Sequence, residues 1–75
     1  MSRDANAIAE RFRKIMGPVA STLAAEAARE SGGRTEGERI VIDDEKKLEK
    51  FRHLMKKKCG KIIGERLAEN ILREG

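Results

Sequence analysis

The chain has 75 residues, of which 40% are charged and 3% aromatic, and its formal net charge is +4. This length predicts one domain over residues 1–75, and one cysteine with one histidine excludes a disulfide framework or a zinc site built by one chain. Charged residues interrupt the apolar stretches, so we expect neither a secretion signal nor a membrane span, and the lone cysteine favours a reducing compartment. We therefore expect a cytoplasmic protein.

Residues 4–29 carry apolar side chains at helical spacing. At about 100° per residue, they form one stripe roughly 120° wide, typical of an amphipathic helix. Ser2 or Asp4 can cap its start by accepting hydrogen bonds from free backbone N–H groups. The large residues of this stripe are Ile8, Phe12, Ile15, Val19 and Leu23.

Gly17 and Pro18 fall in the middle of this stripe. Pro18 lacks an N–H and crowds the carbonyl of Lys14, so it either bends one helix or starts a second one at its first position. The stripe stays in phase from Ile15 to Val19, which favours a single bent helix.

Residues 31–37 read as a hinge rich in small and polar residues. Ser31, Gly32 and Gly33 are expected to end the first helix, with glycine supplying the left-handed cap, and residues 34–37 are expected to form a polar loop. Residues 38–43 alternate around Ile40 and Ile42 and predict a short strand, with an extended loop over the helices as the alternative. As a strand this segment has no partner in the predicted chain, so its edge would have to meet another copy or another protein.

Residues 44–73 predict a second helical stretch, with Asp43 or Asp44 as its cap. Phe51, Met55 and Cys59 cluster on one side, whereas the apolar residues after Gly60 cluster roughly 120–140° away. We therefore expect a break or bend near Cys59 and Gly60, or one long helix that touches different partners at its two ends. Gly60 and Gly64 also have a spacing that lets another helix backbone approach closely.

One face of this second stretch is basic. Lys46, Lys50, His53, Lys57 and Lys61 align along it, opposite the apolar stripe. Such a row could follow a phosphate backbone or an anionic surface, although most charged rows are simply solvated. No arginine or aromatic residue is interleaved for base readout or stacking, so nucleic-acid binding is the second choice.

Glu38–Leu72 resembles the outline of a ribbon-helix-helix DNA-binding domain: a short strand from Arg39 to Ile42, a helix, a turn at Cys59 and a second helix. The resemblance implies a dimer whose strands pair and enter the major groove. The chain departs from it where Arg39 and Asp43 would face outward together, because that pair suits base edges poorly.

Residues that carry chemistry are sparse. Cys59 has lysine neighbours that would lower a thiol pKa, but its angle places it on the apolar face as a core residue. His53 is expected to be a solvated surface residue, and Glu45 with Glu49 suits surface charge pairing better than acid–base work. We expect no enzyme activity, no catalytic, cofactor-binding or metal-binding residues, no cofactor and no small-molecule substrate.

The sequence thus predicts a mainly α protein of two or three amphipathic helices with one extended segment over about 38–43. Two helices and one strand leave apolar faces uncovered, which favours a homodimeric helical bundle joined through an intersubunit two-stranded ribbon or through helices alone. The expected function is a non-catalytic interaction module with a regulatory or adaptor role and an unidentified protein partner, the alternative being a DNA-binding dimer or a nonspecific nucleic-acid binder. The core and interface residues are Ile8, Phe12, Ile15, Val19, Leu23, Ile40, Ile42, Phe51, Met55, Leu67 and Ile71, and the anion-binding face is Lys46, Lys50, Lys57 and Lys61.

Overall fold

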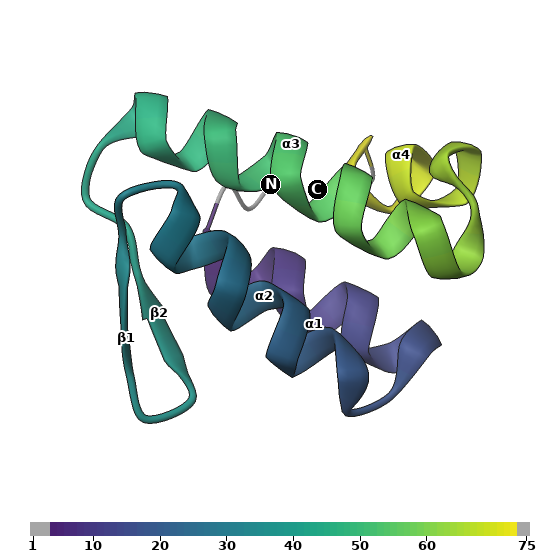
Figure 1. Cartoon of the computed structure of the whole chain (residues 1–75), viewed down its shortest axis with the longest axis horizontal. Coiled ribbons are helices and arrows are strands. Elements are labelled where there is room, and N and C mark those ends of the chain that lie inside the picture. The colour runs from purple at the N-terminus through teal and green to yellow at the C-terminus, as the bar shows by residue number, and fades with distance from the viewer. Residues whose placement is uncertain (1–3, 74–75) are drawn as a thin grey trace.

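The computed structural model describes residues 4–73, which form four helices and one antiparallel hairpin (Figure 1). Helices α1 and α2 form an antiparallel pair, α3 runs along this pair, and α4 folds back at the far end of α3. The hairpin lies at the opposite end of the molecule. The mainly α fold is confirmed. The helices are α1 (Ala5–Met16), α2 (Val19–Glu30), α3 (Glu45–Ile63) and α4 (Glu65–Arg73), and the strands are β1 (Arg34–Glu36) and β2 (Arg39–Val41).

The starts of α1 and α3 are capped as the sequence predicts. The Asp4 side chain accepts a hydrogen bond from the Asn6 N–H at 3.0 Å, and Asp44 accepts one from the Lys46 N–H at 2.9 Å. Each carboxylate therefore satisfies a backbone donor that the helix itself cannot pair. The alternative cap Ser2 lies outside the described residues.

The single bent helix predicted through Pro18 is wrong, because the chain reverses direction there. Gly17 has φ +80° and ψ −157°, a conformation that is essentially restricted to glycine, and α2 begins directly after Pro18. The in-phase pair Ile15 and Val19 was misleading, since both side chains are exposed and neither belongs to the core.

The break predicted near Cys59 and Gly60 is displaced by four residues. Gly60 lies within α3, and the chain turns at Gly64, where φ is +94°. A Cβ at Gly60 would lie 3.1 Å from the Cα of Glu65, so this glycine lets α4 begin close against α3. The spacing of Gly60 and Gly64 therefore did indicate a close approach of another helix backbone, whereas the turn itself needs Gly64.

The predicted polar loop over residues 34–37 is also wrong, because it contains β1. Strand β1 pairs with β2 in the register Arg34 to Val41 and Thr35 to Ile40, with a turn at Gly37 and Glu38. The strand expected over residues 38–43 is real, but its partner lies in the same chain. The two-stranded ribbon is consequently formed within one copy and not between two.

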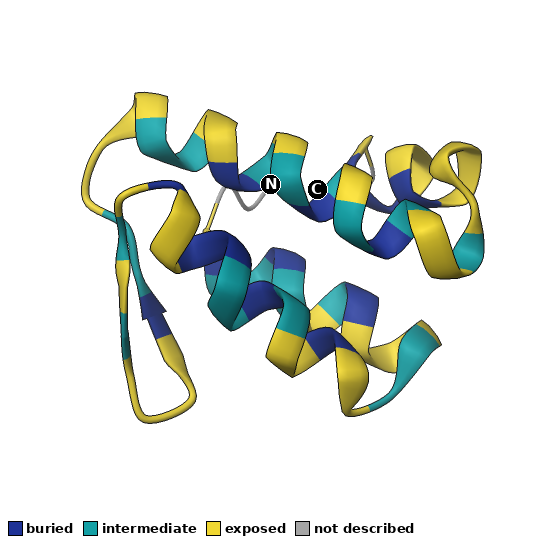
Figure 2. Cartoon of the chain, viewed as in Figure 1, coloured by how far each residue is buried: buried dark blue, intermediate teal, exposed yellow. Residues whose placement is uncertain are grey.

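A single copy of the chain encloses a hydrophobic core between its helices (Figure 2). Phe12 from α1 and Phe51 with Met55 from α3 are fully buried, and the alanines of α2 allow that helix to pack closely against them. The guanidinium of Arg52 donates to the carbonyl of Leu72 at 3.1 Å and thereby holds the last turn of α4 against α3. The expectation that apolar faces stay uncovered without a second copy is therefore wrong for most of the core. The buried apolar residues are Ala5, Ile8, Phe12, Ala20, Ala24, Ala27, Ala28, Ile40, Phe51, Met55, Cys59, Ala68, Ile71 and Leu72.

Candidate interaction surfaces

The residues predicted for the core and interface divide into a buried, a half-buried and an exposed group. The buried group is Ile8, Phe12, Ile40, Phe51, Met55 and Ile71. Leu23 and Ile42 are half-buried and pack against the core. Ile15, Val19 and Leu67 remain exposed, so these three residues are the part of the predicted set that a partner could contact.

The exposed large apolar side chains of the described chain gather around two turns. They are Ile15, Val19, Ile62 and Leu67, with 52%, 43%, 57% and 40% of their surface accessible, and we call them the apolar tip. The first two flank Gly17 and the other two flank Gly64, and both turns lie at the same end of the molecule (Figure 1). Solvated apolar surface that collects in one place is typical of an interaction site.

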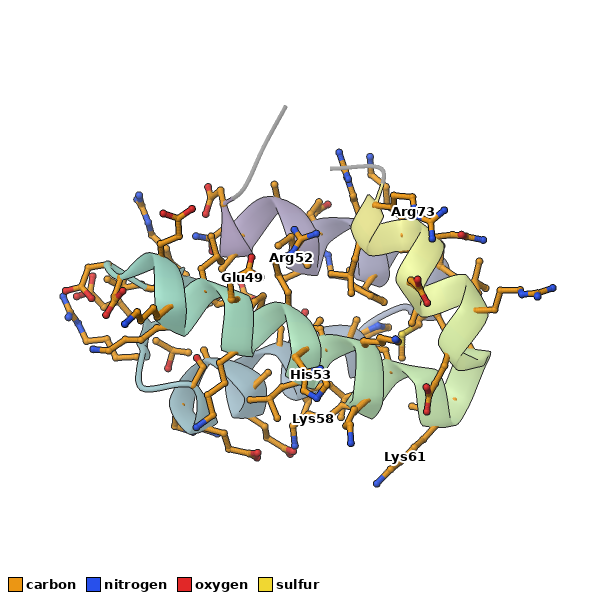
Figure 3. The ribbon with its side chains drawn as sticks, turned by 90° about the horizontal axis from the view of Figure 1, so that it is seen from above. Glu49, Arg52, His53, Lys58, Lys61 and Arg73 are labelled. Carbon is orange, nitrogen blue, oxygen red and sulfur yellow. The ribbon has the colours of Figure 1, made fainter. Side chains whose placement is uncertain are left out.

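The basic face predicted on the second helical stretch is present on α3. Its members are Lys46, Lys50, His53, Lys57 and Lys61, all exposed, and we call them the α3 crest. Figure 3 looks down on α3 and shows His53 and Lys61 along it. Among residues 4–73, no ion pair involves a crest lysine.

The other lysines of α3 are neutralised by acidic residues of neighbouring segments. Lys58 lies 2.9 Å from Glu30 of α2, and this hydrogen bond raises the pKa of its ammonium. Lys56 lies 3.5 Å from Glu69 of α4, and its charge lowers the pKa of that carboxyl. The helix therefore has paired cations along its flanks and unpaired cations along its crest.

An open groove of about 550 Å³ separates the hairpin from α1 and α2. Small side chains such as Ala9 and Ala25 line it, together with Thr35 and Ile40 from the inner face of the hairpin. At its rim, Arg13 forms an ion pair of 2.9 Å with Glu10, and the hydrogen bond between them raises the pKa of Arg13. The groove thus has a mixed lining, in which alanines lie beside polar side chains such as Ser21 and Thr22, and its Arg13 is already paired with Glu10.

Cys59 is fully buried in the core, as its position on the apolar stripe predicts. Burial raises the pKa of its thiol from 9.0 to about 11. The lysines beside it in sequence therefore do not activate it, because burial disfavours the charged thiolate. His53, by contrast, is exposed on the crest.

We expect Cys59 to resist alkylation in the folded protein. At pH 8 a thiol with this pKa is ionised in roughly one molecule in a thousand, and no reagent reaches it without opening the core. Between pH 9 and 11 only the unfolded thiol ionises, so stability should fall as pH rises through this interval. Iodoacetamide labelling at pH 8 with and without urea measures the protection, and equal rates in both conditions would contradict it.

Comparison of the chain with protein-family models, with curated proteins and with solved structures finds no match. Within residues 4–73, none of the helices combines the length and hydrophobicity that crossing a bilayer requires. The same part of the chain contains no group of three histidine, cysteine, aspartate or glutamate side chains placed to hold a metal ion. The surfaces themselves must therefore carry any functional argument.

Proposed function

We propose that this chain is a non-catalytic interaction module that self-associates through its apolar tip. The observation that carries the proposal is the gathering of Ile15, Val19, Ile62 and Leu67 around two turns at one end of the molecule. Polar and charged residues occupy most of the remaining exposed surface. A regulatory or adaptor role follows from this assignment, since the module then acts through the contacts that it makes.

A second copy is the occupant that the tip fits best. Each turn places one apolar side chain before its glycine and one after it, so a twofold axis can set the first turn of one copy against the second turn of its partner. Such an interface is self-complementary, which is the commonest arrangement in homo-oligomers. The apolar residues of each copy would then cover those of the other.

The size of the tip sets the expected strength of the dimer. The molecule measures 27 × 21 × 21 Å, and the tip lies at one end of the long axis. An end face of about 440 Å² is roughly half of what a standard interface buries on each partner. The dimer should therefore be weak, with a Kd between about 1 µM and 1 mM.

Sedimentation velocity over this concentration range tests the proposal. We expect Val19→Ser and Ile62→Ser each to weaken the dimer about tenfold or more, because each replaces apolar contact with a hydroxyl. Val41→Ser is the matched control, since Val41 is half-exposed on the hairpin at the opposite end. A chain that stays monomeric up to 1 mM would overturn the proposal, as would equal weakening by Val41→Ser.

The non-catalytic part of the proposal rests on the placement of the two most reactive side chains. The Cys59 thiol is sealed in the core and kept protonated by burial, while His53 lies on the solvated crest. Nucleophilic catalysis needs an accessible nucleophile within hydrogen-bond reach of a base. An interaction surface is consequently the function that the geometry supports best.

A further inference from the structure

The four lysines of the α3 crest form an extended row of positive charge, with His53 between Lys50 and Lys57. The members of the crest follow one another at intervals of four, three, four and four residues, from Lys46 to Lys61. These intervals keep them on one helix face, and fifteen residues of α-helix rise about 22 Å. Along a B-form duplex, that length corresponds to about six phosphates of one strand.

Within residues 4–73, no acidic side chain forms an ion pair with a crest lysine. Acids of α2, of α4 and of the segment before α3 pair with Lys58, Lys56 and Lys47, at 2.9, 3.5 and 4.0 Å. Glu49, three residues after Lys46 and four before His53, is the one acid of α3 between Lys46 and Lys61, and Figure 3 draws it toward Arg52. The three other lysines of α3 are therefore paired, and its four crest lysines form a line of exposed charge.

We infer that the crest binds the phosphate backbone of duplex nucleic acid without reading its sequence. Lysine ammonium groups act as point charges toward phosphates, whereas base edges are read mainly by planar groups such as guanidinium and amide. Stacking on unpaired bases uses exposed aromatic rings, but Phe12 and Phe51 are both fully buried, which leaves the imidazole of His53 as the one ring on the crest. The chemistry thus favours a duplex over a single strand.

An anionic membrane surface fits the crest less well. Helices that lie in a bilayer interface insert an apolar face beside their cations. The apolar face of α3, formed by Phe51, Met55 and Cys59, is fully buried in the core. A rigid polyanion that lies along the crest needs no such insertion.

Titration of a fluorescein-labelled 20-base-pair DNA duplex at 50 and 200 mM salt tests this inference. If four lysines neutralise four phosphates, the logarithm of the binding constant should fall with the logarithm of the salt concentration with a slope of about −3.6. The affinity should therefore fall about 150-fold when the salt concentration rises fourfold, from 50 to 200 mM. The double variant Lys50→Gln/Lys57→Gln should lose about half of this slope. It should also weaken binding at 50 mM salt by at least tenfold.

The matched control is Lys47→Gln/Lys56→Gln, which removes the same charge from the flanks of the same helix. It should change affinity less than about threefold, because those lysines are already paired. No binding at 50 mM salt, equal weakening by both double variants, or tighter binding to phosphatidylserine vesicles than to the duplex would overturn the inference. Val19→Ser should bind DNA like the wild type, so failure of the tip and failure of the crest are distinguished.

Discussion

Phe51→Ala should remove most of the protein's stability at 25 °C. Phe51 lies on α3, is fully buried and belongs to the core cluster that α1, α2 and α4 also share. Truncation of a buried phenylalanine costs about 3–5 kcal/mol, because contacts are lost and a cavity remains. A 75-residue domain is expected near the lower end of the usual 5–15 kcal/mol range of stability, so this loss is most of the total.

Urea unfolding followed by circular dichroism measures this loss. Ile62→Ala is the matched control, since Ile62 lies on the same helix but exposes 57% of its surface, and its replacement should change stability by less than about 1 kcal/mol. Any dimer should disappear together with the fold of the Phe51→Ala variant, because the tip is held by the same helices. A Phe51→Ala variant that keeps a cooperative transition within 1 kcal/mol of the wild type would contradict the core described here.

The sequence predicts the helices well because their signal is distributed over many residues. The stripe through Ile8 and Phe12 and the stripe through Phe51 and Met55 both form the core, and Asp4 and Asp44 both act as caps. Each of these features depends on local spacing alone, which a sequence displays directly.

The turns and the first strand depend on single residues, so their sequence signals are weaker. Strand β1 has three residues, and only Thr35 faces the helices, which leaves no alternation to recognise. Gly60 and Gly64 look alike in sequence, and the choice between them is decided by where α4 packs. Tertiary contacts therefore determine the positions of the turn and of the first strand, which local sequence propensity does not settle.

For the same reason, the sequence predicts the α3 crest but does not separate the apolar tip from the core. The α3 crest follows from helical spacing, and its lysines are all exposed where that spacing places them. The apolar tip could not be separated from the core, because Ile15 and Val19 continue the stripe of Phe12 across a chain reversal that spacing does not reveal. The pairing of the flanking lysines also needs the folded structure, since Glu26, Glu30 and Glu69 belong to other helices.

Asn6 holds the outer edge of the hairpin against α1. Its side-chain Oδ1 accepts a hydrogen bond from the Ile40 N–H at 2.8 Å, and its Nδ2 donates to the Ile40 carbonyl at 2.8 Å. Because Ile40 lies opposite Thr35 in the ladder, between the pairs that flank it, its backbone groups point away from β1. The amide of Asn6 thus pairs with Ile40 as a neighbouring strand would, and it satisfies these outer-edge backbone groups of β2.

Asn6→Ala should consequently release the hairpin and lower global stability by about 2–4 kcal/mol. Removing the amide leaves one donor and one acceptor of half-buried backbone without partners, and each such group costs about 1–3 kcal/mol when water cannot reach it. Hydrogen exchange of the Ile40 amide should accelerate at least tenfold more than that of buried amides in α3. Native-state exchange measured by NMR, together with urea unfolding, tests both effects.

Two further variants make this test specific to the paired amide. Asn6→Asp retains an acceptor for the Ile40 N–H but sets a carboxylate oxygen against the Ile40 carbonyl, so it should destabilise at least as much as alanine. Asn70→Ala changes an exposed asparagine on α4 and should alter stability by less than about 0.5 kcal/mol. If Asn6→Ala leaves the exchange of Ile40 unchanged, the hairpin is held by the packing of Ile40 alone.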